Sequence, residues 1–360
     1  KNEFETIILN NLGANNIYSE PSDVTRTFAP HPFVPPEDEM TTRCNEIFSI
    51  QVGGLATRLF HTGIKKAVVG ISGGLDSTLA LLVMVKTFDK LGLPRENIVG
   101  ITMPGFGTTG RTYNNSLNMM KSLGVTIKEV DIKPACLQHL KDIDHDLSIL
   151  DVSYENTQAR ERTQILMDYA NKIGGLVVGT GDLSELVLGW ATYNGDHMSM
   201  YAVNTSIPKT LVRYMVKYAA LYEMDEAAKE TLLDVCDTPV SPELLPADDK
   251  GEISQKTEDL VGPYELHDFF IYYTLRFGFS PTKIFFMAQK AFDGQYDKAT
   301  ILKWMRTFYW RFFAQQFKRS CMPDGPKVGS VSLSPRGDLR MPSDACSKIW
   351  IEEVEKLAND

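Results

Sequence analysis

The stretch Val68-Val69-Gly70-Ile71-Ser72-Gly73-Gly74-Leu75-Asp76-Ser77 decides the fold that we predict for this chain. A short apolar run, typical of a buried strand, leads into a Ser-Gly-Gly turn, and a helix is expected to start at Asp76 or Ser77. Two glycines let successive backbone N–H groups point inward, and the positive end of the helix dipole lies just beyond them. This geometry suits an oligophosphate. Asp76 adds a carboxylate that can hold phosphate-bound Mg²⁺, and the competing interpretation is a plain strand–helix turn.

Strand and helix patterns alternate on both sides of this stretch. Four short apolar runs predict strands at Ala67–Ile71, Ile98–Met103, Val125–Val130 and Leu176–Val178. Helical periodicity predicts helices at Thr42–Gly63, Ser77–Leu91, Thr112–Leu123, Ala135–Leu140, Asn156–Ile173 and Leu183–Leu188. Strands of continuous apolar character separated by helices indicate a parallel sheet covered on both faces, a Rossmann-like doubly wound α/β fold. Ligands of such sheets bind beyond the carboxyl ends of the strands.

The remainder of the chain is predicted to be mainly helical. After about Ser206 the strand signal fades, and helices are expected at Lys209–Tyr222, Asp225–Val235, Tyr264–Phe277, Pro281–Ala291 and Lys298–Phe317. Between them, Ala247–Asp259 is polar and charged, which predicts a mobile loop. The stretch Glu20–Glu39 carries five prolines and predicts a linker.

Composition excludes several classes of protein. The 360 residues carry 37 Lys and Arg against 46 Asp and Glu, a net charge of −9 that argues against a protein built to grip nucleic acid. No apolar stretch approaches the roughly 20 residues of a membrane-spanning helix. The five cysteines are widely spaced and form no Cys-x-x-Cys pair, which indicates reduced thiols in a cytoplasmic protein.

Two further glycine-containing motifs compete for interpretation. Gly105–Gly110 (GFGTTG) formally matches a dinucleotide-binding fingerprint with Asp131 at the end of the next strand, but Pro104 separates strand from glycines, and a flexible loop over the site is favoured. In Gly179–Glu185 (GTGDLSE), Asp182 can cap a helix while Glu185 faces the same crevice as Asp76.

These motifs together resemble one family. SGGLDS is the signature of the ATP pyrophosphatases with a PP-loop, which split ATP into AMP and pyrophosphate while adenylating a substrate. The set GISGGLDS, MPGFGTTGRT, ENTQARERTQ, GTGDLSELVLGWATYNGD and SLSPRGD, within about residues 40–350, resembles the synthetase domain of glutamine-dependent NAD⁺ synthetases. The resemblance implies a carbon–nitrogen ligase that uses ATP and Mg²⁺ to convert deamido-NAD⁺ into NAD⁺ through an acyl-adenylate.

The resemblance also implies site residues. It assigns ATP to Gly70, Ile71, Ser72, Gly73, Gly74, Leu75, Asp76, Ser77, Thr180 and Lys209. It assigns Mg²⁺ to Asp76 and Glu185, and catalytic roles to Asp76, Glu185 and Lys209. It assigns deamido-NAD⁺ to Asn156, Glu185, Trp190, Ala191, Thr192, Tyr193 and Lys318. An aromatic shelf for the nicotinate ring and lysines near a pyrophosphate agree with these assignments.

Longer members of the family carry a nitrilase-like glutaminase domain that releases ammonia from glutamine. Nothing before residue 40 matches such a domain, so we expect residues 1–40 to be a tether to it and residues 41–360 to be the synthetase domain. We therefore expect these residues to depend on free ammonia. The resemblance further suggests a homodimer.

Three other functions remain open from the sequence. One is a non-catalytic adenine-nucleotide sensor, which would bind ATP yet release no pyrophosphate when offered deamido-NAD⁺. Another PP-loop enzyme, such as a tRNA-modifying ligase, is disfavoured by the acidic balance and the lack of paired cysteines. An NAD-binding oxidoreductase using GFGTTG and Asp131 would leave SGGLDS and GTGDLSE unexplained.

Overall fold

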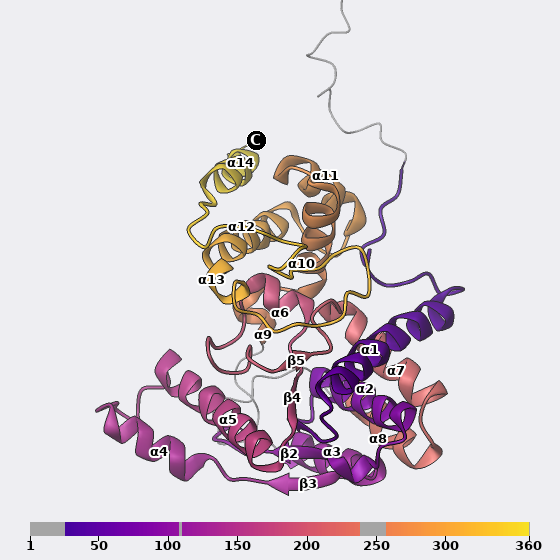
Figure 1. Ribbon diagram of the computed structural model, residues 1–360. Coiled ribbons are helices and arrows are strands. Elements are labelled where there is room, and N and C mark those ends of the chain that lie inside the picture. Colours follow the sequence, from indigo (N-terminus) through magenta and orange to yellow (C-terminus); the bar gives the residue numbers. More distant parts are fainter. Residues whose placement is uncertain (1–25, 108–109, 238–256, 360) are drawn as a thin grey trace, which may run out of the picture.

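The computed structural model describes residues 26–107, 110–237 and 257–359 (Figure 1). Its sheet strands are β1 (Ala67–Gly70), β2 (Ile98–Thr102), β3 (Thr126–Glu129), β4 (Leu176–Gly179) and β5 (Tyr201–Ala202). They pair in the order β3-β2-β1-β4-β5, and every pair is parallel. The chain forms β1, β2 and β3 on one side and then returns to place β4 on the other side of β1, so the strand order reverses between β1 and β4. A crevice is therefore expected at the carboxyl ends of these two strands. The predicted α/β fold is confirmed.

Side-chain alternation along β1 explains why helices cover both faces of the sheet. Ala67 and Val69 belong to the apolar core on one face, whereas Val68 belongs to the core on the other. The first core is shared with the helices α1 (Met40–Thr62), α2 (Leu75–Leu91), α7 (Lys209–Tyr222) and α8 (Glu226–Asp237). The second is shared with α4 (Lys133–Asp142) and α5 (Val152–Ile173), which lie together in Figure 1. α3 (Gly110–Ser122) joins β2 to β3.

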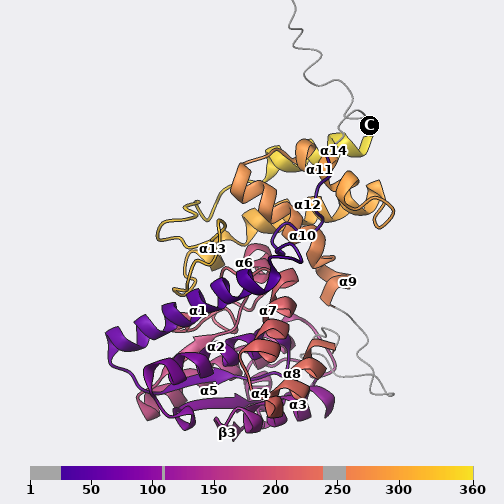
Figure 2. The same ribbon diagram turned by 90° about the vertical axis from the view of Figure 1, so that its right-hand side faces the viewer.

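A third, largely aromatic core lies in a group of helices above the sheet (Figure 2). Its helices are α10 (Tyr264–Ile271), a π-helical turn (Tyr272–Arg276), α11 (Pro281–Ala291), α12 (Lys298–Ala314), α13 (Gln316–Arg319) and α14 (Lys348–Asn359). The short helix α6 (Leu183–Leu188) follows β4 yet buries Leu183, Val187 and Leu188 in this aromatic core. α6 therefore connects the carboxyl edge of the sheet to the helical part.

Apart from shifted ends, such as α5 beginning at Val152 rather than Asn156, the structure differs from the predicted elements as follows. The two-residue strand β5 was not predicted, because two residues carry no periodicity. The helix predicted at Tyr264–Phe277 changes from α to π at Tyr272, and the one predicted at Lys298–Phe317 is divided at Gln315. The polar segment Ala247–Asp259 was predicted as a loop, but its last three residues lie in α9 (Thr257–Val261), and residues 247–256 lie outside the described part.

Residues 26–39 pack on the helical part. His31 lies 3.6 Å from the Glu265 carboxylate, and the ring of Phe33 meets that of Tyr272 edge to face at 5.1 Å. The first 25 residues lie outside the described part, so the expected tether stays a prediction for them.

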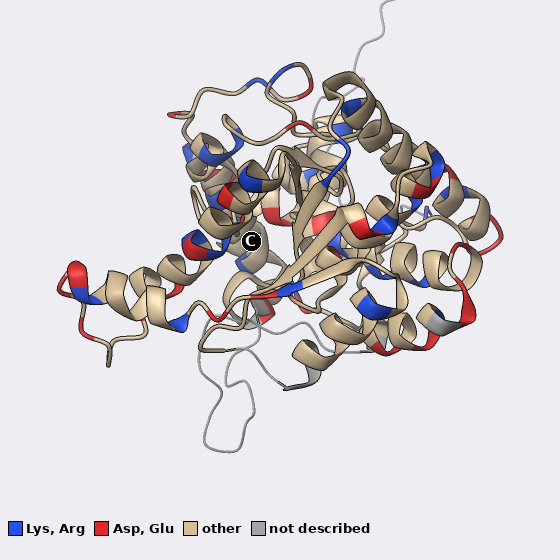
Figure 3. Ribbon diagram, turned by 60° about the horizontal axis from the view of Figure 1, so that its bottom comes forward, with Lys and Arg blue, Asp and Glu red and all other residues tan. Residues whose placement is uncertain are grey.

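Surface charge is mixed. Basic and acidic residues are interspersed over the helices in the view of Figure 3. Within the described ranges, every helix is too short or too polar to cross a lipid bilayer.

Candidate active site

The Ser-Gly-Gly loop that follows β1 leads directly into α2. Gly73 has φ 92°, a left-handed conformation that favours glycine, and α2 begins at Leu75, one or two residues before the predicted start at Asp76 or Ser77. The hydroxyl of Ser72 accepts a hydrogen bond from Gly74 N at 3.2 Å, and among the described residues no side chain caps the first turn of α2. The first N–H groups of α2 are therefore available to an anionic ligand, as the sequence predicted.

The loop that follows β4 leads into α6 in the same way. The Asp182 carboxylate accepts the Glu185 N–H at 2.8 Å, which confirms the predicted cap. The Glu185 side chain reaches the loop after β1, since its carboxylate and that of Asp76 contact the same ammonium, that of Lys209. Asp76 and Glu185, 109 positions apart in the chain, thus come to one place at the sheet edge.

Lys209, the first residue of α7, joins the two loops. Its ammonium lies 2.7 Å from Asp76 Oδ2, 2.6 Å from Asp182 Oδ2 and 2.8 Å from Glu185 Oε1. The Lys209 side chain is 9% exposed, and Asp182 is fully buried. We name Asp76, Asp182, Glu185 and Lys209 the carboxylate–lysine cluster.

The charges of this cluster do not cancel. Three carboxylates surround one ammonium, a formal charge of −2. Burial works against a charged Lys209, but Asp182, Asp76 and Glu185 outweigh it and hold the pKa of Lys209 well above its usual value. Burial raises the pKa of Asp182 well above its usual value, even though Lys209 opposes the shift. A cluster of this charge attracts further cations.

The spacing of the carboxylates, a buried carboxylate oxygen and the charge of this cluster all suit a divalent cation. Oxygens of Asp76, Asp182 and Glu185 lie within 4.8 Å of one another, and Asp76 Oδ1 is buried without a hydrogen-bond partner among the described residues. Carboxylate oxygens are the ligands that Mg²⁺ prefers, and a charge of +2 would neutralise the cluster. Asp182 joins the predicted pair Asp76 and Glu185 as a third carboxylate.

Asn204 ties the two loops to each other. It is fully buried, and its amide donates to Asp76 O at 2.9 Å and to Thr180 O at 3.1 Å. Gln51 on α1 donates in turn to Asn204 Oδ1 at 3.1 Å. Two residues assigned to ATP are therefore fixed from a third segment.

Most residues assigned to the dinucleotide form a second cluster. Thr192 Oγ1 donates to Asn156 Oδ1 at 2.7 Å, which joins α5 to the turn after α6. Lys318 Nζ donates to Gly189 O at 2.7 Å and to Ala191 O at 2.6 Å. Burial lowers the pKa of Lys318.

The two predicted aromatic residues lie in different surroundings. Trp190 is half-buried against the helical core, with the Arg311 guanidinium 5.1 Å from its ring centre. Tyr193 is exposed, stacked on His197 at 5.2 Å and close to Phe317 at 5.3 Å. Tyr193 therefore offers the more accessible ring.

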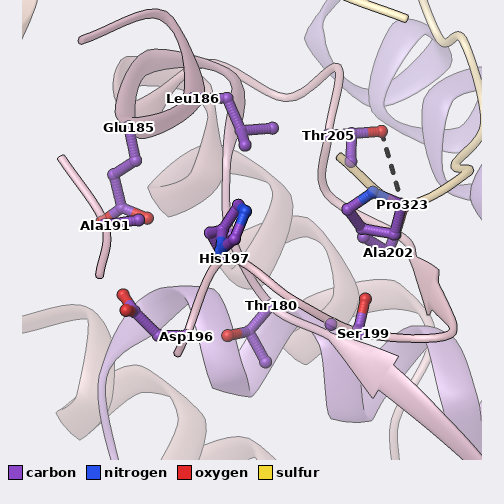
Figure 4. A pocket seen from close by; sticks show the side chains of 12 residues that line it. Thr180, Glu185, Leu186, Ala191, Asp196, His197, Ser199, Ala202, Thr205 and Pro323 are labelled. Carbon is purple, nitrogen blue, oxygen red and sulfur yellow. Dashed lines mark hydrogen bonds between the residues drawn. The ribbon is translucent and has the colours of Figure 1, made fainter. Parts of the chain in front are cut away.

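A pocket connects the two clusters (Figure 4). Glu185 of the carboxylate–lysine cluster, Thr180 of the loop after β4 and Ala191 of the second cluster line it, together with Asp196 and His197. Burial lowers the pKa of His197, and its Nδ1 accepts the Asn194 N–H at 3.1 Å, so the ring is neutral near pH 7. A ligand seated here can touch both clusters.

Four residues at the site were not predicted from the sequence: Asp182 as a partner of Lys209, and Asn204, Tyr264 and Asp268. The GTGDLSE motif offered Asp182 only as a cap. The other three lie in segments without a recognisable motif.

GFGTTG is described only in part, since residues 108 and 109 lie outside the described residues. Phe106 N donates to Gln158 Oε1 at 3.2 Å.

A parallel α/β sheet with an SGGLDS loop opening on its switch point defines a protein of the PP-loop superfamily. Residues 48–226 match the NAD synthase family, and the chain belongs to it. It is 42% identical over 350 residues to a glutamine-dependent NAD(+) synthetase of Mycobacterium leprae (strain TN), covering 90% of this chain and 51% of that protein. The chain thus spans about half the length of such relatives.

Two solved structures share the fold. A glutamine-dependent NAD(+) synthetase from Cytophaga hutchinsonii superposes with a TM-score of 0.71 at 16% identity, covering 88% of this chain and 56% of that one. An NMN synthetase from Francisella tularensis superposes with a TM-score of 0.58 at 22% identity, covering 77% of this chain and 95% of that one. At such identities the likeness concerns the fold alone.

Proposed function

We propose that this chain catalyses the ATP-dependent amidation of deamido-NAD⁺ to NAD⁺, with ammonia as nitrogen donor and AMP and pyrophosphate as co-products. The observation that carries the proposal is the meeting of the loops after β1 and β4 on Lys209 at the switch point of the sheet. Family membership supports amidation over the tRNA-modifying and oxidoreductase alternatives.

ATP is proposed to lie along residues 70–77, with its phosphates on the N–H groups at the start of α2. Thr180 and Lys209 complete this set, because Asn204 holds Thr180 and Asp76 together and Lys209 contacts Asp76. Pyrophosphate leaves with added negative charge, and a nearby ammonium stabilises that charge. Lys209 is proposed to supply this ammonium, because its side chain contacts Asp76 beside the loop after β1.

Asp76 and Glu185 are proposed to hold Mg²⁺, with Asp182 beside them. When bound, Mg²⁺ would neutralise charge that develops on the phosphates during transfer. The chain's own contribution is the geometry of the carboxylates, which the Asp182 cap and the Asn204 amide fix.

Deamido-NAD⁺ is proposed to bind across the pocket to Asn156, Glu185, residues 190–193 and Lys318. The Lys318 ammonium is the cation of this cluster and can approach a substrate phosphate or carboxylate. Tyr193 and Trp190 provide flat surfaces for an aromatic ring.

The proposed chemistry has two steps. A nicotinate carboxylate oxygen attacks the α-phosphorus of ATP, the bond to the β-phosphate oxygen breaks, and pyrophosphate leaves. Ammonia then attacks the carbonyl carbon of the acyl-adenylate, AMP leaves with the electron pair of the acyl–oxygen bond, and the nitrogen loses one proton to solvent. Binding and orientation by the two clusters carry both steps, because the substrates supply the nucleophiles.

The whole protein's context is also proposed. The relatives are glutamine-dependent and about twice as long as this chain, so we propose that residues 41–360 are the synthetase domain, that residues 1–40 tether it to a glutaminase domain, and that glutamine is hydrolysed there. We further propose a homodimer in the cytoplasm. All five cysteines are thiols, which suits that compartment.

The test is NAD⁺ formation by the 360-residue chain with Mg-ATP and deamido-NAD⁺, offered ammonium or glutamine. NAD⁺ with ammonium and equal AMP supports the proposal, whereas no product with either donor and no exchange of pyrophosphate into ATP contradicts it. Deamido-NMN, offered in parallel, tests the substrate, because an NMN synthetase shares the fold.

Asp76→Ala tests the site. The change should abolish pyrophosphate release, because it removes a cluster carboxylate at the phosphate loop. Asp89→Ala on the same helix, which removes only an exposed ion pair with Arg95, is the matched control and should keep normal turnover. Near-normal turnover of Asp76→Ala would remove the metal assignment.

A further inference from the structure

Helix α10 of the helical part contacts the first turn of α7, where Lys209 lies. Asp268 on α10 is 1% exposed, and its Oδ2 accepts the Thr210 N–H at 2.9 Å and the Thr210 hydroxyl at 2.7 Å. Its Oδ1 accepts a short hydrogen bond from the Ser184 hydroxyl. A carboxylate 58 positions away in the chain therefore accepts the N–H of Thr210, the second residue of α7.

The Ser184 hydroxyl, which donates to Asp268, also contacts Lys209. The Ser184 hydroxyl oxygen is fully buried and accepts the Lys209 N–H at 2.8 Å. The residue before Lys209 is Pro208, which has no side-chain cap to offer, so the N–H groups of Lys209 and Thr210 depend on Ser184 and Asp268 for their hydrogen bonds. A negative carboxylate at this end also complements the helix dipole.

A second residue of α10 contacts the other end of Lys209. Tyr264 lies four positions before Asp268, on the same face of α10, and the Lys209 ammonium lies 5.3 Å from its ring centre. The side-chain end of Lys209 therefore meets α10 directly, and its backbone N–H is linked to α10 through Ser184 of α6.

We propose that Asp268 is a positioning residue for the reaction: through Thr210 and Ser184 it fixes the first turn of α7, and with it the Lys209 ammonium. The proposal rests on the proposed function for its kinetic readout. It makes the helical part a component of the ATP site, because α10 lies outside both loops that contact the phosphates.

The experiment compares three variants of the full chain. Asp268→Asn keeps the size of the side chain but loses its charge and one acceptor. Ser184→Ala removes the hydroxyl that joins Asp268 to Lys209 and leaves the contacts of Asp268 with Thr210 in place. Asp297→Ala is the matched control. Asp297 caps α12 in the same helical part by accepting the Thr300 N–H at 2.7 Å, and it is exposed and far from Lys209 in the chain. Circular dichroism and the melting temperature establish that each variant folds.

Asp268→Asn and Ser184→Ala should each lower kcat by about 10- to 100-fold and raise KM for ATP, since small displacements of a positioned group have effects of that size. KM for deamido-NAD⁺ should stay within about twofold. Asp297→Ala should lower the melting temperature and leave kcat and both KM values unchanged. If Asp268→Asn and Ser184→Ala behave like Asp297→Ala, the positioning role is wrong.

A binding measurement separates this proposal from the proposed function. If the unaltered chain forms no NAD⁺, the affinity for Mg-ATP, measured by calorimetry, still reports on Lys209. A loss of about tenfold or more in Asp268→Asn and Ser184→Ala but not in Asp297→Ala supports the positioning role, and equal affinities in all variants overturn it.

Discussion

His267→Gln should remove part of the sensitivity of this fold to acid. His267 is fully buried on α10, its Nε2 donates to Val261 O at 2.6 Å, and its ring lies against those of Trp304 and Phe308. Burial lowers the pKa of His267 from 6.5 to about 4. Gln is chosen because its amide can still donate to Val261 O and does not titrate.

The direction in which pH changes the free energy of unfolding follows from which state, folded or unfolded, takes up the proton. Between about pH 6.5 and 4 the unfolded chain protonates residue 267 and the folded chain does not, so acidification favours unfolding. From pH 7 to pH 5 this residue lowers the free energy of unfolding by about 2 kcal/mol.

The neighbouring residue acts in the opposite direction. Burial raises the pKa of Asp268 from 3.8 to about 6, outweighing the hydrogen bonds from Ser184 and Thr210. The folded chain therefore binds this proton more tightly, and its stabilising effect is present at low pH and lost as pH rises through about 6. From pH 7 to pH 5 Asp268 raises the free energy of unfolding by about 1 kcal/mol.

The assay is urea unfolding at pH 7 and pH 5, followed by tryptophan fluorescence. On going to pH 5, the unaltered chain should lose about 2 kcal/mol more free energy of unfolding than His267→Gln, and Asp268→Asn should lose about 1 kcal/mol more than the unaltered chain. Other titrating groups are common to all three chains and cancel in the comparison. If His267→Gln shows the same loss as the unaltered chain, the buried neutral histidine is not responsible.

Three further changes test other parts of the structure. Lys209→Met leaves three carboxylates without their cation and should lower the free energy of unfolding by about 3 kcal/mol. Millimolar Mg²⁺ should partly restore the melting temperature of this variant, and a melting temperature that does not change with Mg²⁺ would count against the cation site. Gly189→Ala should lower stability by several kcal/mol, about 3 or more in urea unfolding, because Gly189 has φ 58° and an added Cβ would overlap the Gln315 side chain; a loss below about 1 kcal/mol would contradict the close approach. Trp190→Ala should raise KM for deamido-NAD⁺ about tenfold at unchanged KM for ATP, whereas Trp310→Ala, half-exposed on α12, should change neither; an unchanged KM in Trp190→Ala would contradict the stacking role.

The elements with strong local signals could be predicted from the sequence to within a few residues. α7 and α11 begin at Lys209 and Pro281 as predicted, since Pro208 and Pro281 set the backbone at their first positions and apolar periodicity follows. β1 and the turn after it were also predictable, because an apolar strand, two glycines and a helix start coincide there.

The site was predictable only where chemistry and motif coincide. Asp76 and Glu185 follow strands that end at one edge, so their meeting could be predicted, and Lys209 entered through the family resemblance. Asp268 lies in a mostly apolar helix and contacts residues 58 and 84 positions away, a distance that no periodicity encodes. Asn204 follows the two-residue strand β5, which was itself not predictable.

Asn204 limits how this site can be re-engineered. Its amide bridges the two loops from outside both, and Gln51 on α1 holds it in place. A designer who transplanted only SGGLDS and GTGDLSE into another parallel sheet would leave the carbonyls of Asp76 and Thr180 without their common donor. The smallest contiguous block that keeps this bridge runs from Gln51 to Asn204 and carries the strands and both loops with it, whereas the first turn of α7 at Lys209 also needs Asp268 on α10.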